Sequence, residues 1–216
     1  MLGSATSHSA RAAEGRRRTA GRWSIDAGIA LAIALVVTQV PANLIDFGVY
    51  DYRYSLINPN NEQGLFAWIG GVMIALAAVL CVVAARRGQH RAAYFVAAAL
   101  LGIFAVENRV RFDEPTMHRA IVYVPLFGGL LAALVWVSWD WPLATRRLVW
   151  AGLAALLCSL ALHKLAPYLL TQLGYGPGTW PWELKVSFKE SSELIGWTLI
   201  ATGLLAAALR VRRLSA

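Results

Sequence analysis

This sequence contains few charged residues. Only 15% of its 216 residues are Asp, Glu, Lys or Arg, whereas 58% are hydrophobic. A chain so poor in charge does not fit disorder, and one so rich in apolar residues does not fit an ordinary soluble domain. The lipid bilayer is therefore its expected solvent and its first expected partner.

Cysteine and lysine are also scarce. The two cysteines, Cys81 and Cys158, lie inside apolar runs, where each is expected to pack as a small hydrophobe and not to form a disulfide. Three lysines stand against 17 arginines, a bias that, together with abundant alanine, favours a bacterial source. The basic residues form short clusters between apolar runs, so the net charge of +8 indicates membrane orientation and no nucleic-acid partner.

Six apolar windows punctuate the chain, and a helix needs about 20 apolar residues to cross the hydrocarbon core. The prediction is an all-α integral membrane six-helix bundle with approximate spans 24–45, 64–85, 92–107, 120–139, 148–170 and 194–211. Residues 1–22 are expected to be a disordered basic tail that contacts anionic lipid, and residues 23–216 to be the transmembrane domain.

Basic residues are shared unevenly between the two ends of these windows. Thirteen of the twenty fall on the side that holds both termini, against three acidic residues, Glu14, Asp26 and Asp140. Because cytoplasmic loops retain Lys and Arg, both termini are expected in the cytoplasm, in a bacterial inner membrane. One alternative stays open: the first window, followed by Val40, Pro41 and Ala42, resembles a signal peptide, and cleavage there would leave five spans.

Small and aromatic residues inside the windows predict packing and membrane borders. Gly70 with Gly71, and Gly128 with Ala132, are the pairs expected to allow close helix approach. Trp197 is among the tryptophans expected near the outer headgroups.

Acidic residues gather at the outer ends of the windows, and one group surrounds the start of the fourth. In the segment ENRVRFDEPTMHRA, Glu107 ends the third window, and Asp113 or Glu114 can cap the helix that follows. Glu114 and His118 are four residues apart, so they share a face of that helix.

A second acidic group lies in WPWELKVSFKESSELIGW, where a helix is expected to start at Pro181 and run into the sixth window. Glu183, Glu190, Glu193 and Trp197 are separated by seven, three and four residues, which aligns them along one stripe of that helix. Lys185 and Lys189 are expected to project elsewhere.

The two groups together give a hypothesis for a metal site. Its ligands would be Glu114, His118, Glu190 and Glu193, holding a divalent ion such as Zn²⁺ that activates water. Glu107 or Asp113 would be the general base, and His163 in the fifth window a second imidazole or proton relay. The competing interpretation is that these carboxylates pair with nearby Arg and Lys and complement helix N-termini.

The segments FDEPTMH and ESSELIGWTLIATGLL resemble the signatures of a family of bacterial multi-span membrane proteins. The matching positions are Asp113, Glu114 and His118 in the first motif, and Glu190, Glu193 and Gly196 in the second. Arg119 and Lys189 replace glutamates of the family pattern, which removes two possible ligands. The resemblance covers roughly a tenth of the chain and implies a fold but no activity. The ceramidase-like zinc hydrolases offer only an analogy of layout, through His118 and His163.

Three functions are compatible with these patterns. The sequence favours a membrane scaffold or accessory protein that binds membrane-protein partners or a second copy of itself. The alternative is a metal-dependent hydrolase of lipid-linked substrates, although no HExxH motif is present. The third is a proton- or cation-coupled transporter, although no convincing internal repeat is visible.

Overall fold

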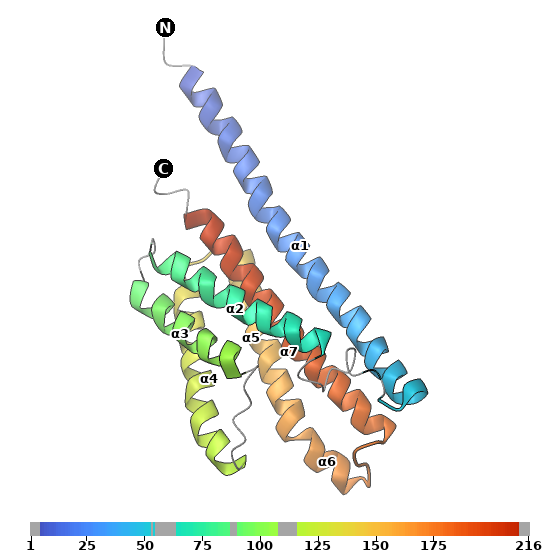
Figure 1. Ribbon diagram of the computed structural model, residues 1–216. Helices are drawn as coiled ribbons and strands as arrows, with labels where there is room; N and C mark the ends of the chain where they lie inside the picture. Colours follow the sequence, from blue (N-terminus) through green and yellow to red (C-terminus); the bar gives the residue numbers. More distant parts are fainter. Residues whose placement is uncertain (1–4, 53, 55–63, 87–89, 108–115, 212–216) are drawn as a thin grey trace.

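The computed structural model describes residues 5–52, 54, 64–86, 90–107 and 116–211, with the side chains of 5–21, 107–122 and 210–211 left out. All secondary structure in these residues is helical (Figure 1). The helices are α1 (Ala5–Tyr50), α2 (Leu65–Ala85), α3 (Arg91–Glu107), α4 (Thr116–Ser138), α5 (Leu143–Lys164), α6 (Ala166–Gln172) and α7 (Trp180–Val211).

Four segments among the described residues are long and apolar enough to cross a membrane: Arg22–Tyr50, Leu65–Ala85, Leu143–Gln172 and Trp180–Leu209. The apolar helical segments Arg91–Val106 and Tyr123–Ser138 are shorter. The prediction of an all-α fold is confirmed for the described residues, and so is the prediction of helices long and apolar enough to cross a membrane. The remaining two spans of the predicted six stay a prediction.

Helix boundaries depart from the predicted windows at the start of α1 and within the fifth window, and agree with the prediction at the start of α7. α1 begins at Ala5, inside the segment predicted to be a tail, and continues through Pro41 to Tyr50. The fifth window is divided after Lys164, because Pro167 in the first turn of α6 has no N–H to continue the helical ladder. α7 is one continuous helix of 32 residues from Trp180, with Pro181 in its first turn, as expected.

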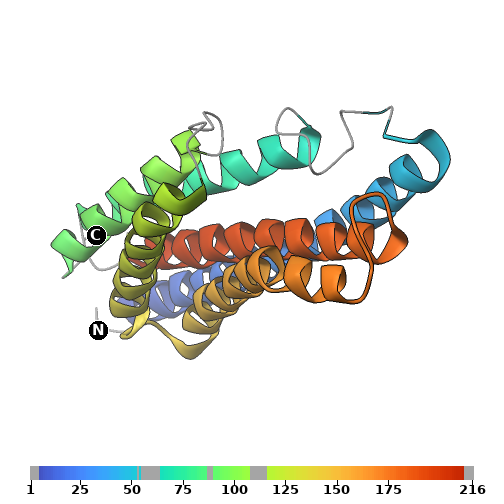
Figure 2. The same cartoon turned by 90° about the horizontal axis from the view of Figure 1, so that it is seen from below.

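α7 is the central helix of the bundle. In its most apolar window 72% of residues are buried, against 28% for α1. It packs against α1, α2 and α5, and α2 packs in turn against α3. Figure 2 shows α7 between α2 on one side and α1 with α5 on the other. The outward faces of the surrounding helices expose large apolar side chains such as Val72 and Val79, as lipid contact requires.

α5 and α7 approach closely at Gly152 and Gly196, for which the sequence patterns predicted no helix contact. A Cβ atom on Gly152 would lie 2.7 Å from the carbonyl oxygen of Gly196. By contrast, a Cβ on Gly70 or Gly128 would meet no atom within 4 Å, so the expected close packing at those two glycines is wrong. Small residues alone do not identify a contact, because the facing helix decides which ones are used.

Two further expectations about packing need correction. Trp197 is only 5% exposed and lies against Phe104 in the core, so it does not mark a membrane border. Cys81 is buried as expected, whereas Cys158 is exposed on the outward face of α5.

Candidate functional site

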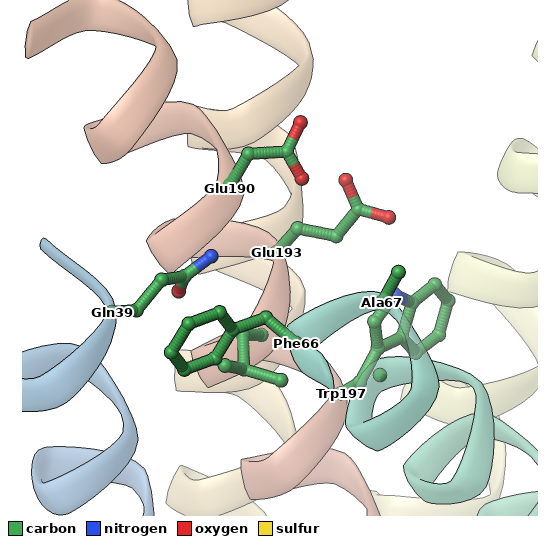
Figure 3. A pocket seen from close by; sticks show the side chains of 8 residues that line it. Gln39, Phe66, Ala67, Glu190, Glu193 and Trp197 are labelled. Carbon is green, nitrogen blue, oxygen red and sulfur yellow. The ribbon is translucent and has the colours of Figure 1, made fainter. Parts of the chain in front are cut away.

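A small cleft opens between α1, α2 and α7, and encloses about 290 Å³ of empty space including its open mouth. Figure 3 shows it from close by. Its lining residues are Gln39, Phe66, Ala67, Gly70, Glu190, Glu193, Leu194 and Trp197. Two of the predicted metal ligands, Glu190 and Glu193, therefore do lie together.

A lysine sits between these two carboxylates. The Lys189 ammonium donates to Glu190 Oε1 at 2.6 Å and lies 3.7 Å from Glu193 Oε2. The expectation that Lys189 projects elsewhere is therefore wrong. Both glutamate side chains and the lysine are partly buried, so the three charged groups contact each other at the edge of the cleft. This pairing fits the competing interpretation, in which these carboxylates pair with nearby Arg and Lys.

The cleft also contains an unpaired donor. The indole Nε1 of Trp197 is buried and has no hydrogen-bond partner in the part of the chain that the structure describes. The ring follows Glu193 by one helical turn and borders the same space (Figure 3). Donor and acceptor groups thus face one small opening.

The other predicted site residues are not brought into this cleft by the described structure. Asp113, Glu114 and the side chains of Glu107 and His118 lie outside the described residues. His163 is on the last turn of α5, where its side chain is exposed, and it does not line the cleft. Among the residues that were described, no group of three or more His, Cys, Asp or Glu is placed to hold a metal ion. The zinc site stays a prediction.

A polar seam between α1 and α7 is the feature that sequence reasoning missed. It contains Gln39, Asn43 and Asp46 from α1 with Ser187 and Ser191 from α7, all nearly or fully buried. Asn43 Nδ2 donates to Ser187 Oγ at 2.6 Å, and Ser191 Oγ donates to Gln39 Oε1 at 3.3 Å. These bonds fix the rotation and register of the two helices, because a buried polar group without a partner is costly.

Beyond Asp46 the seam ends in a tight turn. Asp51 and Tyr52 have φ values of 51° and 59°, a left-handed conformation that costs a non-glycine residue about 1 kcal/mol. The turn brings the Tyr52 N–H to 3.0 Å from the Asp46 carbonyl oxygen, and the Tyr54 N–H to 3.0 Å from Asp46 Oδ1. The chain therefore folds back over the end of α1.

Tyr52 joins this turn to α7. Its hydroxyl donates to the carboxylate of Glu183, which is 3% exposed in the first turn of α7. The pKa of Tyr52 is raised, first by burial, then by the hydrogen bond and negative charge of Glu183, and then by the charges of Asp46 and Asp51. Glu183 lies at this end of the seam and does not line the cleft, so the predicted stripe of glutamates is divided between two places.

A signal for the seam is present in the sequence. Gln39, Asn43 and Asp46 are spaced by four and three residues in an otherwise apolar stretch, which places them on one face of a membrane helix. Polar residues inside such helices usually face another helix.

Known proteins offer no further guidance to the site. Comparison of the chain with protein-family models, with curated proteins and with solved structures found no match.

Proposed function

We propose that the chain is a six-span bundle of a bacterial inner membrane, with both termini in the cytoplasm, that acts as a scaffold or accessory subunit. Four membrane-length helices and two shorter apolar ones support the number of spans. The first turns of α1 and the last turns of α7 lie at the same end of the bundle (Figure 1), as a shared side for the termini requires. The one-sided distribution of arginines supports the orientation.

The scaffold role rests on one observation, the pairing of Lys189 with Glu190 and Glu193 at the cleft. A catalytic metal site needs carboxylates available to the ion, and here the charge is already engaged by an ammonium group. The outward faces of the surrounding helices present continuous apolar surface to lipid or to other membrane proteins.

The orientation is tested with topology reporters. A reporter that is active only outside the cytoplasm is expected to work when fused after Asn60 or Pro177 and to fail after Gly88 or Asp140. Activity after Gly88 would reverse the orientation. Loss of the first 42 residues from the mature protein would establish signal cleavage.

The scaffold role is tested with E190Q, E193Q and H118A in the full-length protein. Each variant is expected to retain wild-type folding, wild-type metal content and the ability to complement a deletion strain. K189A is the matched variant that disturbs the same cleft from the basic side. Loss of bound zinc from a folded E190Q or H118A protein would overturn the proposal and favour the metal-dependent hydrolase.

A further inference from the structure

Three buried oxygen atoms at the outer end of the α1–α7 seam have no hydrogen-bond partner among the described residues. They are Asn43 Oδ1, Asp46 Oδ2 and Glu183 Oε2, on side chains that are 0%, 0% and 3% exposed. All three are acceptors. The Tyr54 N–H donates to Asp46 Oδ1 and the Tyr52 hydroxyl to Glu183, but neither bond reaches the three unpaired oxygens. Acceptors left over in this way bond a proton or a cation, since hydrogen bonds cannot form among acceptors alone.

The contacts between the two helices bring the side chains that carry these oxygens to the same end of the seam. Asn43 and Asp46 are three residues apart on α1, and Glu183 and Ser187 are four apart on α7, so each pair shares a helix face. A hydrogen bond of 2.6 Å from Asn43 Nδ2 to Ser187 Oγ joins the two faces. The Ser187 hydroxyl is itself anchored to the Glu183 carbonyl oxygen at 2.9 Å.

The cluster is also closed from outside. The ring of Trp180 contacts Phe47 edge-on, with 4.9 Å between ring centroids. Gly48 makes room for this ring, because a Cβ there would lie 2.8 Å from Trp180 Cη2. Tyr52 reaches the same end of α7 through its hydrogen bond to Glu183. Carboxylates shielded in this way need a counter-charge.

The charges of Lys185 and Glu183 interact, but no ion pair joins these two side chains in the described residues. The Lys185 ammonium lies 4.2 Å from the centroid of the Trp182 ring, and Lys189 pairs with Glu190. A divalent cation would neutralise both Asp46 and Glu183. Carboxylate and amide oxygens are the ligands that calcium takes, at flexible geometry, whereas zinc prefers imidazole and thiolate.

We propose that Asn43, Asp46 and Glu183 form a binding site for a hard divalent cation, calcium, that joins the outer ends of α1 and α7. The site lies outside the Glu190–Glu193 cleft and goes beyond the scaffold role. Its ligands differ from the residues whose variants test that role, so one proposal can fail while the other stands.

The test is thermal unfolding of the full-length protein in detergent, in EDTA and in calcium. At about 100-fold excess over the dissociation constant, calcium is expected to raise Tm by about 5 to 10 °C. D46N and E183Q are expected to lose this rise, and to be at least as stable as wild type in EDTA because less charge is buried. E190Q and E193Q, carboxylate variants in the neighbouring cleft, are expected to keep it.

Asn43→Ala keeps both carboxylates and removes one ligand. It is therefore the variant to measure if D46N and E183Q do not fold. Its half-maximal calcium concentration is expected to rise about tenfold. An unchanged midpoint in N43A, or an equal Tm rise in D46N and wild type, would overturn the proposal. A rise with zinc and not with calcium would also do so.

Two other counter-charges give distinct results. A shared proton would raise Tm on acidification and leave it unaffected by calcium, which contradicts the proposal. Arg53 follows Tyr52 and lies outside the described residues. If R53Q keeps the rise of Tm in calcium, the cation site is supported. If calcium does not change the Tm of wild type and R53Q has a lower Tm than wild type, arginine is the counter-charge and the proposal fails.

Discussion

The central helix α7 presents two different kinds of surface to its neighbours. Toward α5 it offers Gly196 and Gly203, which bring the backbones into contact. Toward α1 it offers Ser187 and Ser191, which exchange hydrogen bonds with amide side chains. The first surface works by shape and dispersion and tolerates no added atom. The second works by pairing and tolerates change only when both partners change.

The largest expected effect comes from filling the glycine contact. Gly152→Val would place side-chain atoms against the Gly196 carbonyl oxygen, already 2.7 Å from a built Cβ. Backbone cannot rotate away as a side chain does, so we expect a loss of about 3 kcal/mol in the free energy of unfolding, measured by denaturant titration in detergent. The control is Gly102→Ala, whose Cβ meets no atom within 4 Å. Equal losses in the two variants would remove the distinction between the α5 contact and an ordinary helix glycine.

Breaking the seam at its shortest bond is expected to cost less. Asn43→Ala removes the donor to Ser187 and should lower the free energy of unfolding by about 1 to 2 kcal/mol, measured in EDTA so that no cation contributes. Combined with S187A, the pair should show a coupling of about 1 kcal/mol. Thr38→Ala is the control on α1, since within the described residues that hydroxyl bonds carbonyl oxygens of its own helix, those of Ala34 and Leu35. A coupling near zero would mean that the bond does not join the helices.

Tyr52→Phe tests the outer end of the seam. Loss of its hydrogen bond to Glu183 should cost about 1 kcal/mol at neutral pH. The pKa of Tyr52 is raised above its ordinary value of 10.0, so the folded protein holds the proton more tightly than the unfolded chain. That contribution is complete below about pH 10 and is lost as the pH rises further. Wild type should therefore lose stability more steeply than Y52F in alkaline thermal scans.

The control for this pH effect is Tyr168→Phe, because Tyr168 is exposed on α6. Its alkaline stability profile should match that of wild type. A Y52F profile parallel to wild type would show that burial of the Tyr52 phenol does not contribute to the pH dependence.

The smallest effect is expected at the inner part of the seam. The bond from Ser191 Oγ to Gln39 Oε1 is 3.3 Å long, and Gln39 also borders the open cleft. A double-mutant cycle of Q39A and S191A should give a coupling of about 0.5 kcal/mol or less. A coupling free energy equal to that of Asn43 with Ser187 would show that bond length and shielding from solvent do not set the strength of the hydrogen bonds in the seam.

Much of the fold was predictable, because spans follow from composition over about 20 residues and need no knowledge of neighbours. The window at 194–211 falls within α7, and the window at 64–85 matches α2 to within one residue. The division between α5 and α6 was missed, although Pro167 marks it, because the apolar run alone continues across it. For the site, the joint position of Glu190 and Glu193 followed from their spacing of three on one helix face.

The rest of the site depends on contacts between residues far apart in the chain. Asn43 meets Ser187 across 144 positions, and Lys189 turns toward Glu190 where helical spacing suggested it would point away. The sequence by itself determined which segments are apolar enough to cross a membrane, the kind of secondary structure and the uneven placement of the charges, because each follows from local residue type. Only the tertiary structure decided which glycines touch, which carboxylates are buried and where Glu183 lies. Those outcomes depend on the face that each helix turns to its neighbour, and a periodic pattern on one helix does not say which neighbour will meet it.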